Sequence, residues 1–160
     1  MKTTIGIDNG PTGTIGILND RFGALFEETP TQPCLHYGKK GTKTQRLNRE
    51  ELLRLLTLLE SSPIMAYLER PFTGRFPAAN ISAARFYEAT IISLEDLGIG
   101  YRTIDSREWQ LPMLGKVKGS ANLKKASMMR GIEMFPSHAK AIKSHGDADG
   151  LLIASFYHSH

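Results

Sequence analysis

The stretch Ile5-Gly6-Ile7-Asp8-Asn9-Gly10 decides the fold that this sequence predicts. It is a short apolar run that ends in one carboxylate and is followed by a turn signal. Such a run predicts a buried strand, and an acid at the end of a buried strand is costly unless it is paired or bound to a cation. We therefore interpret Asp8 as one of several carboxylates that meet at one edge of a sheet and hold divalent metal ions.

The length and cysteine content indicate one intracellular domain. The 160 residues are most economically a single domain spanning positions 1–160, and they suffice to bury a core. One cysteine, Cys34, cannot form an internal disulfide, which fits a reducing cytoplasm. We expect neither a membrane span nor a signal peptide, because the apolar runs are too short and the first one contains Asp8.

The charge is unevenly distributed along the chain. The formal net charge is +4, with 12 Lys and Arg against 6 Asp and Glu between Arg70 and Lys143. The other residues hold 8 against 10. An anionic partner is consistent with this basic excess, although a solvated basic surface would give the same count.

The apolar patterning and the turn residues predict a mixed α/β fold. Strands are expected at Thr3–Asp8, Gly13–Leu18, Phe22–Glu28, Ile64–Glu69 and Gly100–Ile104. Helices are expected at Arg49–Ser61, Ser82–Leu97, Ser106–Leu114, Asn122–Phe135 and from Asp147 to Tyr157. Thr29–Asn48 is expected to be a long exposed loop and Ser137–Lys143 a linker. This order predicts a mixed five-stranded sheet with helices on both faces.

Carboxylates occur at three places that this fold could bring together. Asp8 ends the first strand, Glu69 ends the fourth, and Asp147 and Asp149 open the last helix. If the first and fourth strands are neighbours, Asp8 and Glu69 lie side by side, and Mg²⁺ or Mn²⁺ would relieve their repulsion. Two ions roughly 4 Å apart, held by three or four acids, can hydrolyse a phosphodiester. Each acid also has a simpler interpretation: Asp8 or Asp147 as a cap, and Glu69 as a partner of Arg70.

Taken in order, several stretches resemble the RuvC-type Holliday-junction resolvases, in particular their short phage and plastid branch. These stretches are Ile5–Gly13, Leu68–Pro71, Ile104–Gln110, Lys124–Ser127, Phe135-Pro136 and Ala148–Ala154. The resemblance implies a ribonuclease H-like fold, a homodimer, and Mg²⁺-dependent paired nicks across a four-way DNA junction. It also implies that Asp8, Glu69 and Asp149 bind metal, and a phage origin would place the protein in the host cytoplasm.

The chain departs from this family at one position. The family commonly has an acid or a histidine three residues before the last Asp, where this chain has Gly146. His145 and Asp147 are both candidates for the fourth active-site group. Residues four apart share a helix face, which favours His145, unless Asp147 lies before the first full turn. His145 would then activate water or contact the phosphate, because Mg²⁺ prefers oxygen ligands.

Basic and aromatic residues near these acids are candidate nucleic-acid contacts. Lys116 and Lys118 lie in a Gly/Lys loop, Lys124 and Lys125 follow it, and Arg70, Arg75 and Arg85 flank Glu69. Such cations bind phosphates with little sequence preference. Phe72 and Phe76 lie in the loop after Glu69, where an exposed ring could stack on an unpaired base. The alternatives are a solvated loop for the cations and packing onto the core for the rings.

Three other functions compete with junction cleavage. The segment Asp8–Gly13 also resembles the phosphate loop of actin-like ATPases and sugar kinases, but these need a second domain for which 160 residues leave no room. A ribonuclease H-like enzyme acting on RNA–DNA hybrids or other branched DNA would use the same acids. A junction-binding module without catalysis would not need Asp8, Glu69 and Asp149. The helix predicted at Ser82–Leu97 is the candidate dimer face.

Overall fold

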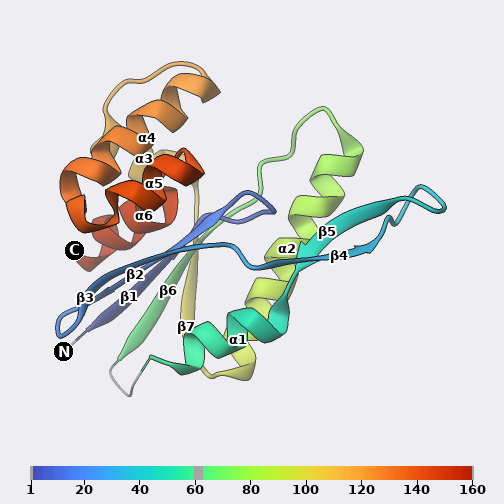
Figure 1. Cartoon of the computed structure of the whole chain (residues 1–160), viewed down its shortest axis with the longest axis horizontal. Coiled ribbons are helices and arrows are strands. Elements are labelled where there is room, and N and C mark those ends of the chain that lie inside the picture. Colours follow the sequence, from blue (N-terminus) through green and yellow to red (C-terminus); the bar gives the residue numbers. More distant parts are fainter. Residues whose placement is uncertain (1, 60–62, 160) are drawn as a thin grey trace.

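Seven strands form over residues 2–59 and 63–159, the part of the chain that the computed structural model describes (Figure 1). They are β1 (Thr3–Ile7), β2 (Thr14–Asn19), β3 (Gly23–Glu28), β4 (Thr31–Leu35), β5 (Lys43–Leu47), β6 (Ile64–Glu69) and β7 (Gly100–Ile104). The helices are α1 (Arg49–Thr57), α2 (Pro77–Asp96), α3 (Ser106–Leu114), α4 (Ser120–Met134), α5 (Ala139–His145) and α6 (Asp149–His158). A 3₁₀ turn, η1 (Pro136–His138), precedes α5.

The main sheet is mixed and has the strand order β3-β2-β1-β6-β7. Strands β1, β6 and β7 run parallel, whereas β2 is antiparallel to β1 and to β3. The predicted five-stranded mixed sheet with helices on both faces is therefore confirmed, as is the pairing of the strands that precede Asp8 and Glu69. Ile7 pairs with Leu68, so the chain leaves β1 and β6 side by side. We call this end of the sheet the carboxylate edge.

Side chains alternate between two cores on opposite faces of the sheet. Ile5 and Ile7 of β1 face α1 and α2, where they join Leu52, Phe86 and Leu94. The second core contains residues of α3, α5 and α6, with Trp109, Ile142, Leu151 and Leu152 fully buried. Figure 1 shows α3–α6 gathered on one side of the sheet and α1 and α2 on the other.

Glycines bring α6 into direct contact with the sheet. A Cβ atom on Gly6 of β1 would lie 2.2 Å from the carbonyl oxygen of Gly150, and one on Gly16 of β2 would lie 2.3 Å from the backbone nitrogen of Leu151. Any side chain at these positions would push the helix away, since these neighbours are backbone atoms. The close contact places Asp149, the first residue of α6, at the carboxylate edge.

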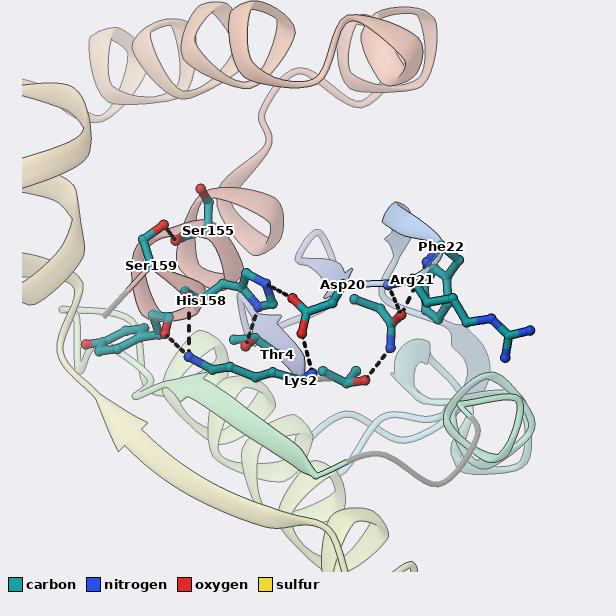
Figure 2. A network of polar contacts seen from close by, with 11 residues as sticks. Lys2, Thr4, Asp20, Arg21, Phe22, Ser155, His158 and Ser159 are labelled. Carbon is teal, nitrogen blue, oxygen red and sulfur yellow. Dashed lines mark hydrogen bonds and ion pairs between the residues drawn. The ribbon is translucent and has the colours of Figure 1, made fainter.

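The other end of α6 is held by the polar network that Figure 2 shows. The Lys2 ammonium donates to the carbonyl oxygens of Tyr157 and His158 at 3.2 and 3.1 Å, where a cation also favours the helix dipole. His158 is 2.9 Å from Thr4 Oγ1 and 3.1 Å from Asp20 Oδ1. These contacts fix His158 in place near the C-terminus, whereas His160 lies outside the described residues.

Two segments predicted to lack regular structure are ordered elements. Thr29–Asn48 is not a loop, because β4 and β5 pair as an antiparallel hairpin with Thr31 opposite Leu47. Most of its side chains are polar, and its few apolar residues do not alternate as in a half-buried strand. The predicted linker Ser137–Lys143 falls largely within η1 and α5, where Ile142 alone is fully buried.

Several helix boundaries also differ from the prediction. Helix α2 begins at Pro77 rather than Ser82, because proline is favoured in the first helical turn. Helix α1 ends at Thr57, and residues 60 and 61 of its predicted span lie outside the described residues. Helix α4 begins at Ser120 rather than Asn122, and the Asn122 side chain donates to the Lys118 carbonyl oxygen. No helix within the described residues has the length and apolar character of a membrane span.

Candidate metal centre and nucleic-acid interface

Three carboxylates from two ends of the chain meet at the carboxylate edge. Oxygen atoms of Asp8, Asp147 and Asp149 all lie within 4.8 Å of one another. Asp8 follows β1, Asp149 opens α6, and Asp147 lies in the turn between α5 and α6. Asp147 is only 1% exposed, and its Oδ1 has no hydrogen-bond partner among the described residues. Because a buried anionic oxygen without a partner is costly, this atom is suited to bind a cation.

Glu69 adjoins this group at the end of β6. Its Oε2 accepts a hydrogen bond of 2.6 Å from Nε1 of Trp109, which is fully buried on α3. Glu69 is not one of the three acids whose oxygens lie within 4.8 Å of one another. Its charge nevertheless raises the pKa of Asp8 from the neighbouring strand. The Trp109 bond fixes one oxygen of Glu69 and leaves the other available to a ligand.

Asp149 is held by a serine from a different helix. Ser127 Oγ of α4 donates a very short hydrogen bond to Asp149 Oδ1 and accepts one of 3.0 Å from the backbone N–H of Ala148. Helix α4 can approach this turn because Gly131 has no side chain: a Cβ there would lie 2.2 Å from Ala148 Cβ. Ser127 thus sets the position of both the turn and the carboxylate.

Burial and mutual repulsion raise the pKa of three carboxyl groups at this edge. Burial is the largest cause of the raised pKa of Asp8, and the charges of Asp149, Glu69 and Asp147 raise it further. Burial, with a contribution from Asp149, raises the pKa of Glu69 to about 7 despite the opposing Trp109 hydrogen bond. Burial and Asp147 raise the pKa of Asp149 to about 6. A divalent cation would remove this repulsion.

The donor set fits a hard divalent cation. Asp8, Asp147 and Asp149 offer carboxylate oxygens, Glu69 can supply another, and Mg²⁺ and Mn²⁺ both prefer such ligands. Lys124 is the nearest compensating charge in the described residues, with its Nζ 3.5 Å from Asp147 Oδ2. One ammonium does not balance four acids, so the site retains excess negative charge for an ion.

The structure separates the two candidates for the fourth group. His145 ends α5, and Gly146 follows it with a φ of 103°, so His145 and Asp149 belong to different helices. The argument from a shared helix face was therefore wrong, and Asp147 lies before the first turn of α6. Asp147 joins Asp8 and Asp149, whereas His145 Nε2 lies beside them, 3.6 Å from Asp147 Oδ1 and 3.1 Å from the Thr12 carbonyl oxygen.

Most of the predicted nucleic-acid contacts are exposed. Lys116, Lys118, Lys124, Lys125 and Arg75 all have solvent-accessible side chains. Arg70 Nε lies 3.6 Å from Asp105 Oδ1, so Arg70 pairs with Asp105 and not with Glu69. Arg85 lies over the ring of Tyr37, with 5.4 Å between its Cζ and the ring centroid.

Both aromatic residues of the loop after Glu69 point into solvent. Phe72 is 88% exposed and Phe76 is 75% exposed, so neither packs onto the core. Exposed phenylalanines next to a charged site are unusual unless they contact a partner.

Sequence reasoning missed the supporting residues of this site. Trp109 is a core residue, and its hydrogen bond to Glu69 was not predicted. The available signal was chemical, since a buried indole N–H requires an acceptor. Ser127 was noticed only as part of a resembling stretch, and no local pattern relates it to Asp149, which is 22 residues away.

Comparison with solved structures identifies the fold. Thermus thermophilus RuvC in complex with a Holliday junction substrate superposes with a TM-score of 0.57 and 15% identity, covering 99% of this chain and 96% of that chain. The Thermus thermophilus RuvC structure gives a TM-score of 0.55 and 15% identity over 98% and 95% of the two chains. This chain has a RuvC-like fold. The identity is too low to assign it to the phage and plastid branch.

A scan against protein-family models found no match, and a search of curated proteins found none either. The likeness therefore concerns the arrangement of the chain in space, and function must be argued from the site.

Proposed function

We propose that this protein is a divalent-metal-dependent endonuclease that resolves four-way DNA junctions. The observation that carries the proposal is the meeting of Asp8, Asp147 and Asp149, with Glu69 on the adjacent strand, at one sheet edge. Two bound Mg²⁺ or Mn²⁺ ions would supply an activated water and stabilise the leaving oxygen of a phosphodiester. A cluster of buried, mutually repelling carboxylates has a direct use in such chemistry and destabilises the protein otherwise.

The residues of the site divide into ligands and supports. Asp8, Glu69, Asp147 and Asp149 are the proposed ligands, and Trp109 and Ser127 hold two of them in place. His145, beside Asp147, is placed to orient a water or contact the attacked phosphate. Lys124 would meet a backbone phosphate close to the acids.

A branched substrate is supported by the surroundings of the site. Phe72 projects into solvent from the loop that follows Glu69, where its ring can stack on a base that is unpaired at a junction. Arg70 and Arg75 flank this ring, and the loop carrying Lys116 and Lys118 leads into α4. The RuvC neighbour that superposes over nearly the whole chain was itself solved with a Holliday junction.

The experiment is cleavage of a synthetic four-way junction in Mg²⁺ by the wild-type protein, Asp8→Asn and Asp96→Asn. Asp96 is an exposed acid paired with Arg49 at the end of α2, so its variant carries the same chemical change far from the site. We expect the wild type and Asp96→Asn to nick opposite strands symmetrically, and Asp8→Asn to bind the junction without cutting. Equal cutting by Asp8→Asn would remove Asp8 from the mechanism.

Substrate choice separates this proposal from a ribonuclease H-like activity. An RNA–DNA hybrid of the same length, offered beside the junction, should be cut at least tenfold more slowly. Preferential cutting of the hybrid would replace the junction as the proposed substrate.

Paired nicks require two active sites, and we propose a homodimer with two-fold symmetry. Helix α2 is the proposed contact, since Ile81 and Ile92 on it are 46% and 42% exposed. Light scattering should give twice the chain mass of 17.7 kDa at micromolar concentration. Charge substitution of Ile92 should halve that mass, and a wild-type monomer bound to the junction would contradict the proposal.

A further inference from the structure

The β4–β5 hairpin contributes only Leu47 to the two cores. Figure 1 shows it extending from the body beyond α2. It forms a two-stranded sheet of its own, with order β4-β5, and Leu47 at its base is its only buried hydrophobic residue. An isolated two-stranded hairpin is marginally stable, so an ordered one that buries so little requires another explanation.

The hairpin carries a concentrated positive charge. Its residues, 31–47, contain four Lys and Arg and no Asp or Glu. Lys39, Lys40 and Lys43 are exposed, and none of them pairs with an acid in the part of the chain that the structure describes. Three unpaired lysines at one tip repel one another, which favours a polyanionic partner.

The hairpin is also fixed in position against α2. The Tyr37 hydroxyl donates a short hydrogen bond to the Ala78 carbonyl oxygen in the first turn of α2, and Arg85 of α2 lies over the Tyr37 ring. The His36 ring stacks on the Tyr37 ring, with 4.5 Å between their centroids. These contacts hold the lysines at a defined place instead of on a freely moving loop.

The base of the hairpin joins the carboxylate edge. The Thr29 N–H donates to the Gly13 carbonyl oxygen at 2.9 Å, and Gly13 lies in the turn that follows Asp8. A surface hollow between the hairpin, this turn and α2 is lined by Pro11, Lys43, Thr44, Gln45 and Ser82. Lys43 therefore lies beside the turn that follows Asp8, on the α2 side of the sheet.

We propose that the β4–β5 hairpin is a nucleic-acid-binding arm that holds the phosphate backbone of a duplex on the α2 side of the active site. The lysines Lys39, Lys40 and Lys43 contact phosphates, and the loop carrying Lys116 and Lys118 holds the duplex on the other side of the carboxylate edge. The inference rests on the proposed nuclease function, because the arm is argued to grip the substrate of that same site. Contacts of this kind are sequence-independent and weaken with salt.

The test compares Lys39→Gln/Lys40→Gln with Arg21→Gln/Arg54→Gln. Both double variants lower the net charge by the same amount. Arg21 lies in the β2–β3 turn, at the end of the sheet away from Asp8, and Arg54 lies on α1. Binding of a fluorescent four-way junction is measured by anisotropy, in the Asp8→Asn background with Mg²⁺, over a series of salt concentrations. Melting temperatures of all proteins establish that they are folded.

We expect the hairpin variant to bind about tenfold more weakly in moderate salt, and the slope of log affinity against log salt to fall by about 2 for two lost phosphate contacts. The Arg21/Arg54 variant should keep the parent affinity and slope. A hairpin variant with the parent affinity and slope would overturn the inference, as would an equal loss in the control.

The two proposals fail in different ways. If the wild-type protein cuts the junction and the hairpin variant binds it normally, only the arm is wrong. If the hairpin variant loses binding and the wild type does not cut any junction, the arm stands and the proposed activity is wrong.

Discussion

The Trp109 indole donates a 2.6 Å hydrogen bond to Glu69 Oε2, and so links α3 to the end of β6. This bond joins a fully buried core residue to a proposed metal ligand. It leaves Glu69 with one fixed and one available oxygen, as expected of a residue that orients a ligand.

Replacing Trp109 with phenylalanine should weaken metal binding. The ring would still fill most of the site, but Glu69 would lose the donor that fixes it, which typically costs about 10–100-fold in affinity or activity. Isothermal titration with Mn²⁺ gives the affinity without any cleavage. Phe86→Leu in the opposite core is the control, since it should lower stability and leave Mn²⁺ affinity unchanged. An unchanged Mn²⁺ affinity in Trp109→Phe would show that the bond is only structural.

The fluorescence of Trp109 should report occupancy of the site. Trp109 is the single tryptophan of the chain and contacts Glu69 directly. We expect Mn²⁺, a paramagnetic ion, to quench its emission in a saturable way, and Asp8→Asn to shift the midpoint to higher Mn²⁺. Quenching that is linear in Mn²⁺ and identical in both proteins would indicate collisions in solution instead of binding.

Ser127→Ala should displace Asp149. The variant removes the donor to Asp149 and the acceptor for the Ala148 N–H, leaving two buried polar groups without partners at a cost of about 1–3 kcal/mol. Ser93→Ala is a matched control, because Ser93 is also fully buried but bonds only to the Ala89 carbonyl oxygen within α2. Urea unfolding and the cleavage rate should show a loss of activity for Ser127→Ala beyond its loss of stability. Equal activity of the two variants would remove Ser127 from the site.

Gly16→Ala should separate α6 from the sheet. The added Cβ would meet the backbone of Gly150 and Leu151 at 2.3 to 2.4 Å, so we expect a loss of about 1–3 kcal/mol in stability and of metal affinity. Gly100→Ala is the comparison, since its Cβ would meet the flexible Met65 sulfur at 3.4 Å and the Ile64 carbonyl oxygen at 4.0 Å, both ordinary contact distances. Thermal melting with and without Mn²⁺ separates the two effects. A Gly16→Ala protein with wild-type stability would mean that the close packing of α6 on β2 does not contribute to stability.

The metal-free protein should lose stability as the pH rises. The folded-state pKa values of Asp8, Glu69 and Asp149 are raised, so the folded protein binds more protons than the unfolded chain above pH 4. The free energy of unfolding therefore falls between about pH 4 and pH 7, where Glu69 ionises. Urea unfolding in a chelator at pH 5 and pH 8 measures this fall, which Asp8→Asn should reduce. Added Mn²⁺ should restore stability at pH 8, and higher stability at pH 8 than at pH 5 without metal would contradict the assignment.

The sequence determined the main sheet and part of the site. The apolar runs ending at Asp8 and Glu69 predicted two buried strands, and their parallel pairing placed both acids at one edge. Such runs are readable because burial imposes a period on the residues of each element. The β4–β5 hairpin could not be predicted in this way, since most of its residues are polar and it is held by Tyr37 against α2.

Only the tertiary structure decided which residues complete the carboxylate group. The sequence favoured His145 over Asp147 on the assumption of one continuous helix, but the positive φ of Gly146 ends α5 before α6 begins. The contacts of Trp109 with Glu69 and of Ser127 with Asp149 depend on how α3 and α4 pack on the sheet. A local pattern records whether a residue is buried, but the atom it meets is set by the packing of elements that are distant in the chain.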